Sequence, residues 1–221
     1  MPSKRSALLS LAVIALTATA AEAQVGVAAR ASTLGIGAEL SYRVNRTVGL
    51  RAGGNFGSLT RTADIEGIEY DVKPKFSNGT AIVDLHPFGG SFHLSAGMVL
   101  NSNEGEVEAR LNGPITIGQQ TYQPDQVGEL TGLIDYEKKT APYLGLGFGG
   151  QGRISFLFDV GVVFSGHPRV GLTGGGNLTG QEKVIFDQNV EAEVAEIQAK
   201  IDDEKYLKYY PVVSLGIRIG F

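Results

Sequence analysis

Seven ionisable residues of this chain lie in segments where apolar residues alternate with small or polar ones, and each occupies a position of the small or polar set. A period of two places the two sets on opposite faces of a strand. If such strands close into a barrel, their polar faces meet inside, where buried charges must pair. The sequence therefore predicts an interior charge network. Its members are Glu39, Arg43, Arg51, Asp84, His93, Asp159 and Arg218.

Two interpretations of this network are open. In the first, Arg43 and Arg218 pair with Glu39 and Asp84, and the charges neutralise one another in a plug that fills the interior. In the second, the polar side chains line a narrow conduit. Glycines on the same faces favour the plug, because they let strands approach closely and leave little free volume, as in small eight-stranded barrels.

Nucleophilic catalysis needs a hydroxyl beside a base. His86 and His93 flank the turn at Pro87–Gly90, and Ser91 and Ser95 lie nearby, but these residues form no recognisable motif. His167 stands alone. We therefore predict no catalytic residue.

Metal and cofactor sites have equally little support. The chain has no cysteine, so it has no thiolate ligands. Asp202, Asp203 and Glu204 are acidic neighbours, but they lack the spaced ligands of a Ca²⁺ loop. The formal net charge of −4 gives no reason to expect nucleic acid as a partner. No metal, cofactor or nucleic acid is predicted.

The N-terminus has the pattern of a secretory signal peptide. Lys4 and Arg5 precede an apolar run over residues 7–20, and Ala21-Glu22-Ala23 is a small-x-small cleavage site. We expect residues 1–23 to be removed and residues 24–221 to form one domain.

Alternating segments recur through residues 24–221, and we predict about eight antiparallel strands in an up-and-down barrel. Residues 61–70 are polar and predict a loop. Residues 102–128 predict an excursion beyond the bilayer with short extended pieces. The predicted strands are 24–31, 34–44, 48–58, 72–86, 91–101, 129–149, 154–166 and 209–221.

One segment changes period. Apolar residues from Val190 to Ile201 recur at helical spacing among acidic residues, so residues 187–205 predict an amphipathic helix inserted before the last strand, with Asp187 as its N-cap. We expect this helix outside, docked over the barrel mouth, where its acidic surface could contact an envelope or surface partner.

The last segment carries an unbroken apolar face that ends on an aromatic residue. Its members are Tyr209, Val213, Leu215, Ile217, Ile219 and Phe221. Together with SYRVNRTVGLRAG, DLHPFGGSFHLSAG and APYLGLGFG, it makes the chain resemble the small outer-membrane β-barrel proteins of Gram-negative proteobacteria, in an uncharacterised branch. The resemblance implies an all-β transmembrane barrel in the outer membrane, in contact with its lipid. It also implies that the barrel assembly machinery recognises the final strand.

No activity follows from that resemblance. The first hypothesis is a non-enzymatic envelope protein with a structural, adhesion or surface-interaction role. The alternative is a narrow pore for small polar solutes. A lipid-modifying enzyme, which would use Ser and His near the lipid face, is a remote third.

Overall fold

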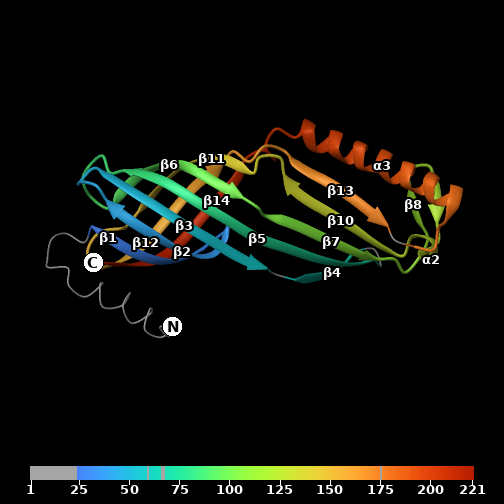
Figure 1. Ribbon diagram of the computed structural model, residues 1–221, viewed down its shortest axis with the longest axis horizontal. Coiled ribbons are helices and arrows are strands. Elements are labelled where there is room, and N and C mark those ends of the chain that lie inside the picture. Colours follow the sequence, from blue (N-terminus) through green and yellow to red (C-terminus); the bar gives the residue numbers. More distant parts are fainter. Residues whose placement is uncertain (1–23, 59, 66–67, 175) are drawn as a thin grey trace, which may run out of the picture.

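A closed ring of eight antiparallel strands forms the body of the molecule (Figure 1). The computed structural model describes residues 24–58, 60–65, 68–174 and 176–221, so the expected signal peptide lies outside the described part. The last strand pairs with both the first strand and its own predecessor, and so closes the ring. In ring order the strands are β1 (Val25–Ser32), β2 (Gly35–Arg43), β3 (Val48–Ser58), β5 (Ile68–Leu85), β6 (Phe92–Asn101), β11 (Thr140–Phe148), β12 (Ile154–Val163) and β14 (Tyr210–Gly220).

The predicted alternation is present on every one of these strands. Large apolar side chains point outward, and Ile36, Phe156 and Leu215 are 73%, 79% and 60% exposed. Small and polar residues point inward, where Asp84 and Asp159 are 4% and 1% exposed. A core that is polar inside and apolar outside suits a strand with lipid on its outer face.

The turns β2–β3, β5–β6 and β11–β12 and both ends of the described chain lie at one end of the ring, which we call the turn end (Figure 1). The β2–β3 turn is closed by Asn45, whose side-chain oxygen accepts the N–H groups of Thr47 and Val48 at 2.8 Å each. The β11–β12 turn needs backbone conformations that favour glycine, with φ values of 123°, 80° and 76° at Gly149, Gly150 and Gly152.

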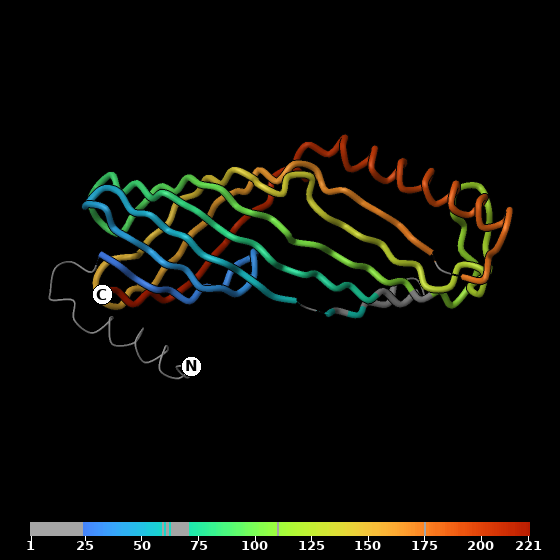
Figure 2. The backbone as a smooth tube through the Cα atoms, in the orientation of Figure 1, coloured from blue at the N-terminus to red at the C-terminus, as the bar shows by residue number. Residues whose placement is uncertain are grey.

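At the opposite end the sheet continues past the ring as a five-stranded extension (Figure 2). β5 extends beyond the ring strands with which it pairs. Each of the other four strands directly follows a ring strand in the sequence or directly precedes one. Hydrogen bonds join them in the order β4, β5, β7, β10, β13. The new strands are β4 (Arg61–Ile65), β7 (Glu104–Arg110), β10 (Glu129–Tyr136) and β13 (Pro168–Gly174).

The extension corrects two sequence predictions and adds a strand where none was predicted. The polar stretch at 61–70 is not a loop, since it forms β4 and the start of β5. The single strand predicted over 129–149 is two strands, because Glu137–Lys139 interrupts it and hydrogen-bonds across to His167 and Ser165 instead. The glycine-rich stretch at 167–180 contains β13.

A long helix, α3 (Gly180–Asp203), runs beside the extension. It begins seven residues earlier than predicted, with Thr179 at the N-cap position; Asp187 lies inside the helix and forms an ion pair with Lys183. α3 contacts β13 and the small hairpin of β8 (Ile115–Ile117) and β9 (Gln120–Tyr122). The helix therefore docks on the extension and not, as predicted, on the barrel mouth.

The packed side of α3 completes a second apolar core outside the ring. Phe186 and Val190 are buried against Leu130 of β10 and Val127 of the short helix α2 (Pro124–Val127). The ring of Phe186 meets that of Tyr122 edge-on at 5.1 Å. In the described part of the chain, none of the helices has the length and apolar character needed to cross a membrane.

Candidate functional site: the charge cluster inside the barrel

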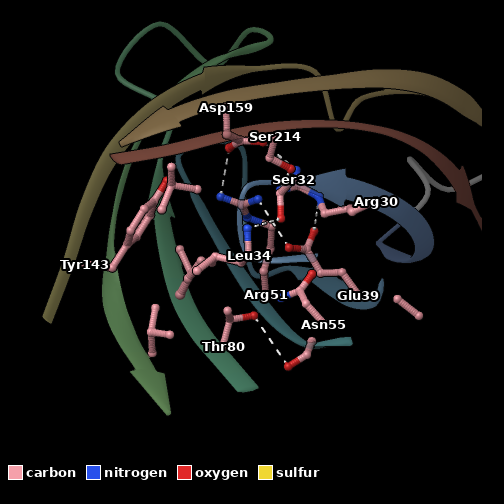
Figure 3. Close-up of a pocket in the computed structure, with 15 residues that line it drawn as sticks. Arg30, Ser32, Leu34, Glu39, Arg51, Asn55, Thr80, Tyr143, Asp159 and Ser214 are labelled. Atoms are coloured by element: carbon pink, nitrogen blue, oxygen red, sulfur yellow. Dashed lines mark hydrogen bonds and ion pairs between the residues drawn. The ribbon is translucent and has the colours of Figure 1, made fainter. Parts of the chain in front are cut away.

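Arg51 of β3 lies at the centre of a buried ionic cluster (Figure 3). Its Nε is 2.6 Å from Asp84 Oδ2 on β5. Its two terminal nitrogens reach Glu39 Oε2 on β2 at 3.3 Å and Asp159 Oδ1 on β12 at 3.1 Å. One cation therefore joins carboxylates from three other strands.

Arg30 of β1 supplies the second cation. Its Nε lies 3.4 Å from Glu39 Oε1, and its guanidinium also forms an ion pair with Asp159. The same group donates to the Ser214 hydroxyl on β14 at 3.3 Å. Arg30 thus links the first, second and last strands across the seam where the ring closes.

His93 of β6 binds the same carboxylate from the other side. Its Nε2 is 3.0 Å from Asp159 Oδ1, and its Nδ1 is 3.2 Å from the carbonyl oxygen of Ser91. Both ring nitrogens face acceptors, so both contacts are hydrogen bonds only when both nitrogens carry a proton. Arg30, Arg51 and His93 thus surround the three carboxylates Glu39, Asp84 and Asp159.

This arrangement is a mutual neutralisation of charges. Carboxylates and guanidiniums removed from water are costly unless each finds opposite charge and good hydrogen bonds. Ser95 adds such bonds, since its hydroxyl donates to Asp84 Oδ1 at 2.7 Å and accepts from Arg51 at 3.1 Å. The cluster therefore ties together strands that are far apart in sequence.

Apolar side chains close the interior on the side facing the extension. Tyr143, packed among them, is 4% exposed. Between this layer and the ionic cluster lies a cavity of about 30 Å³, roughly one water molecule's share of liquid volume. The layer consists of Leu34, Ile82, Val99, Ala141, Tyr143, Val163 and Val212.

A second cavity of about 40 Å³ lies on the turn-end side of the cluster. Arg43, Arg218 and His86 line it, and His86 lies between β5 and the turn that follows it. Arg218 donates to the Ser41 hydroxyl at 2.9 Å and to the Gly152 carbonyl oxygen at 3.1 Å. The guanidinium of Arg43 is 3.3 Å from His86 Nε2.

His86 differs from His93 in the partners of its ring nitrogens. Its Nδ1 lies 2.9 Å from the Gly90 carbonyl oxygen and its Nε2 faces the Arg43 donor. A neutral ring protonated on Nδ1 satisfies both contacts. The two imidazoles, 5.2 Å apart between centroids, are both buried inside the barrel.

The structure brings five of the seven predicted network residues together, namely Glu39, Arg51, Asp84, His93 and Asp159. The pairing is corrected, however. Glu39 and Asp84 bind Arg51 and Arg30, which fill the roles expected of Arg43 and Arg218. The reason is position along the barrel axis, because Arg43 and Arg218 lie nearer the turn end.

Arg30 is a member of the cluster that was not predicted from the sequence. Its signal was present, because Arg30 stands at an even position of a strand whose odd positions are Val25, Val27, Ala29 and Ala31. It therefore shares the inward face with Gly26 and Ala28, and the buried Ala28 confirms that face.

The hydroxyl and imidazole groups of this cluster are not arranged as a nucleophile beside its base. The hydroxyl of Ser95 contacts Asp84 and Arg51, not an imidazole. Within the described ranges, no three His, Asp or Glu side chains are placed to hold a metal ion.

No protein-family model matches the sequence, and no curated protein matches it. Solved structures do match. The crystal structure of Acinetobacter baumannii CarO aligns with a TM-score of 0.62 and 24% identity, over 90% of this chain and 98% of the other. The likeness is one of fold, a closed antiparallel β-barrel. CarO2 of the same organism aligns with a TM-score of 0.62 and 22% identity, over 91% of this chain and all of the other.

The closing strand of this barrel has its apolar face outward, as predicted. Val213, Leu215, Ile217 and Ile219 are all exposed on the outer surface. The final residue, Phe221, donates its backbone N–H to the Val25 carbonyl oxygen at 2.8 Å and so joins the two ends of the ring. Its role as an assembly signal, with that of Tyr209 and the strand as a whole, stays a prediction.

Proposed function

We propose that the chain is a non-enzymatic integral protein of the outer membrane, secreted with the help of residues 1–23, whose extension presents a surface for interaction outside the cell. The observation that carries the proposal is the combination of an apolar outer belt on all eight ring strands with a neutralised ionic cluster inside. A belt of this kind is stable in lipid, where backbone hydrogen bonds must be satisfied within the ring.

The filled interior favours a structural and surface role over transport. Arg51 spans the interior between β2, β5 and β12, and the apolar layer beside Tyr143 lies next to it. A solute would have to displace paired buried charges, which is costly. The binding function is therefore assigned to the extension and α3, which project beyond the ring (Figure 1).

The surface of α3 is suited to a cationic partner. Its exposed residues include Glu191, Glu196 and Asp203, while the packed side faces the apolar core. Complementary charge steers association and sets specificity. An acidic helix also avoids an anionic lipid surface, which keeps it available to partners.

A pore is the second candidate function, and the two cavities on either side of the Arg51 cluster favour it. If the cluster moves, these cavities could join. Liposome-swelling assays with small polar solutes separate the two functions, since a pore admits solutes and a plugged barrel does not.

The membrane placement has its own test. Expressed in a Gram-negative host, the chain should fractionate with the outer membrane, migrate differently on gels with and without heating, and expose α3 to protease added to intact cells. Recovery in the soluble periplasmic fraction would contradict the proposal.

A further inference from the structure

The turn end of the barrel carries arginines around a cavity with no acidic lining residue. The cavity has a volume of about 370 Å³ and is lined by side chains and backbone from three different turns, among them Arg43, Arg46 and Gln151. This volume is many times the ~30 Å³ that one water molecule occupies in the liquid. We call it the turn-end cavity.

Hydrogen bonds hold its walls in place. The Gln151 side chain donates to the Gly89 carbonyl oxygen at 3.0 Å, which ties the β11–β12 turn to the β5–β6 turn. Arg218 donates to the Gly152 carbonyl oxygen from inside the barrel at 3.1 Å. The cavity is therefore bounded by connected turns and not by independent loops.

The charge of two lining arginines is not neutralised. Arg43 contacts the neutral ring of His86, and Arg46 has no hydrogen-bond or ion-pair partner among the residues that the structure describes. The carboxylates one level deeper, Glu39 and Asp84, are bound by Arg30 and Arg51. The turn-end cavity therefore has a positive potential.

Backbone N–H groups add to the positive potential of the turn-end cavity. The N–H groups of Gly150, Gln151 and Gly152 have no acceptor within the described ranges. Gly150 and Gly152 have positive φ, and a side-chain Cβ there would meet nothing within 4 Å. Unpaired N–H groups in a glycine-rich turn form the concave anion-binding arrangement known as a nest.

We propose that the turn-end cavity binds a phosphate group, either of free phosphate or of a phospholipid headgroup, with Arg43 and Arg46 as the principal ligands. Arginine forks match phosphate geometry and bind it through charge-assisted hydrogen bonds. Two guanidiniums and the amides of the β11–β12 turn supply more donors than the two oxygens of a carboxylate can accept. This inference needs only the folded barrel and does not depend on the proposed surface function.

The test is isothermal titration of inorganic phosphate into the refolded full-length chain in a zwitterionic detergent. The variant R43Q/R46Q keeps hydrogen-bonding side chains but removes both charges. Wild type should bind saturably, and the variant should lose about tenfold or more in affinity, because each bond to a charged group contributes substantially. Arg169→Gln on β13, far from the cavity and exposed, is the matched control and should bind as wild type does.

The two phosphate sources are separated in nanodiscs. If a lipid headgroup is the ligand, anionic phosphatidylglycerol in phosphatidylcholine raises the thermal unfolding midpoint of wild type and not of R43Q/R46Q. If a soluble anion is the ligand, only added phosphate does so. Heat-dependent gel migration verifies that the variant is folded, and Arg46→Gln alone, at an exposed turn position, replaces it if the double variant fails to fold. Absence of any wild-type response, or an equal response in the variant, would overturn the proposal.

Discussion

A guanidinium buried in a narrow barrel is stable only if its charge is matched, and Arg51 meets this demand through contacts with three carboxylates. Each carboxylate also has a further partner: Arg30 for Glu39 and Asp159, His93 for Asp159, and Ser95 for Asp84. Removing one member therefore leaves others buried and uncompensated, which costs more than the pair contributes.

Arg51→Ala should lower the free energy of unfolding by about 3–5 kcal/mol, since it leaves Asp84 buried without its cation. Urea unfolding in lipid vesicles, followed by tyrosine fluorescence, measures the loss. Arg169→Ala, on the exposed face of the extension, is the control and should change little. An Arg51→Ala protein as stable as wild type would mean that water already solvates the interior.

Sequence pattern identified most of this site but not its pairing. Parity assigned each charged residue to the inside, and the structure agrees for all seven. The height of each residue along the barrel axis depends on how the strands are staggered. A period of two gives the face on which a residue lies but not this height. This is why Arg43 and Arg218 were matched with carboxylates that Arg51 and Arg30 bind.

At the scale of elements, α3 and the extension stabilise each other through one small apolar core. Phe186 and Val190 are the buried residues of the helix, while its later apolar residues are only partly covered. The second half of α3 is fixed instead by Gln198, which bonds the backbone of β13 at Val170 and Pro168, at 3.1 Å each.

Phe186→Ala should loosen α3 from the extension and leave the ring intact. Truncating a buried phenylalanine costs about 3–5 kcal/mol, and here the cost falls on the extension alone. Limited proteolysis should cut the variant faster within residues 104–136, with heat-dependent gel migration unchanged. Val184→Ala, on the same helix but 54% exposed, should behave as wild type. Loss of the folded ring in Phe186→Ala would show that the helix is part of the barrel core.

Deleting Phe221 tests the closing strand. The residue is the last in the chain and bonds β1 through its backbone, so the deletion should lower the amount of assembled, heat-modifiable protein in the outer membrane. Phe88→Ala, at an exposed aromatic of the turn end, controls for loss of an aromatic as such. Equal assembly of the deletion and wild type would count against a role for the terminal aromatic.

The elements that sequence missed share a physical cause. β4 and the first residues of β5 stand beyond the ring and lie in the stretch 61–70, whose polar composition predicted a loop. The first turn of α3 contains Gly180, Gln181 and Glu182, with no apolar residue to indicate the start of a helix. The ring strands were identified by a regular apolar face, whereas the composition of these two stretches concealed their structure.

In the whole molecule, the ring and the extension differ in character. The ring anchors the chain by its apolar belt and is filled by the Arg51 cluster and the apolar layer. The extension and α3 stand clear of it at the end opposite both termini (Figure 2). Such a division lets the exposed surface vary without disturbing the barrel, as loops on a rigid scaffold do.

Conductance across a planar lipid bilayer tests whether the interior of the ring is filled. Purified, refolded wild-type protein, shown to be folded by its heat-dependent gel migration, should leave the current at the background of the protein-free bilayer, because paired charges and apolar side chains fill the ring. Reproducible single-channel steps from the wild-type protein would contradict the account and establish a pore.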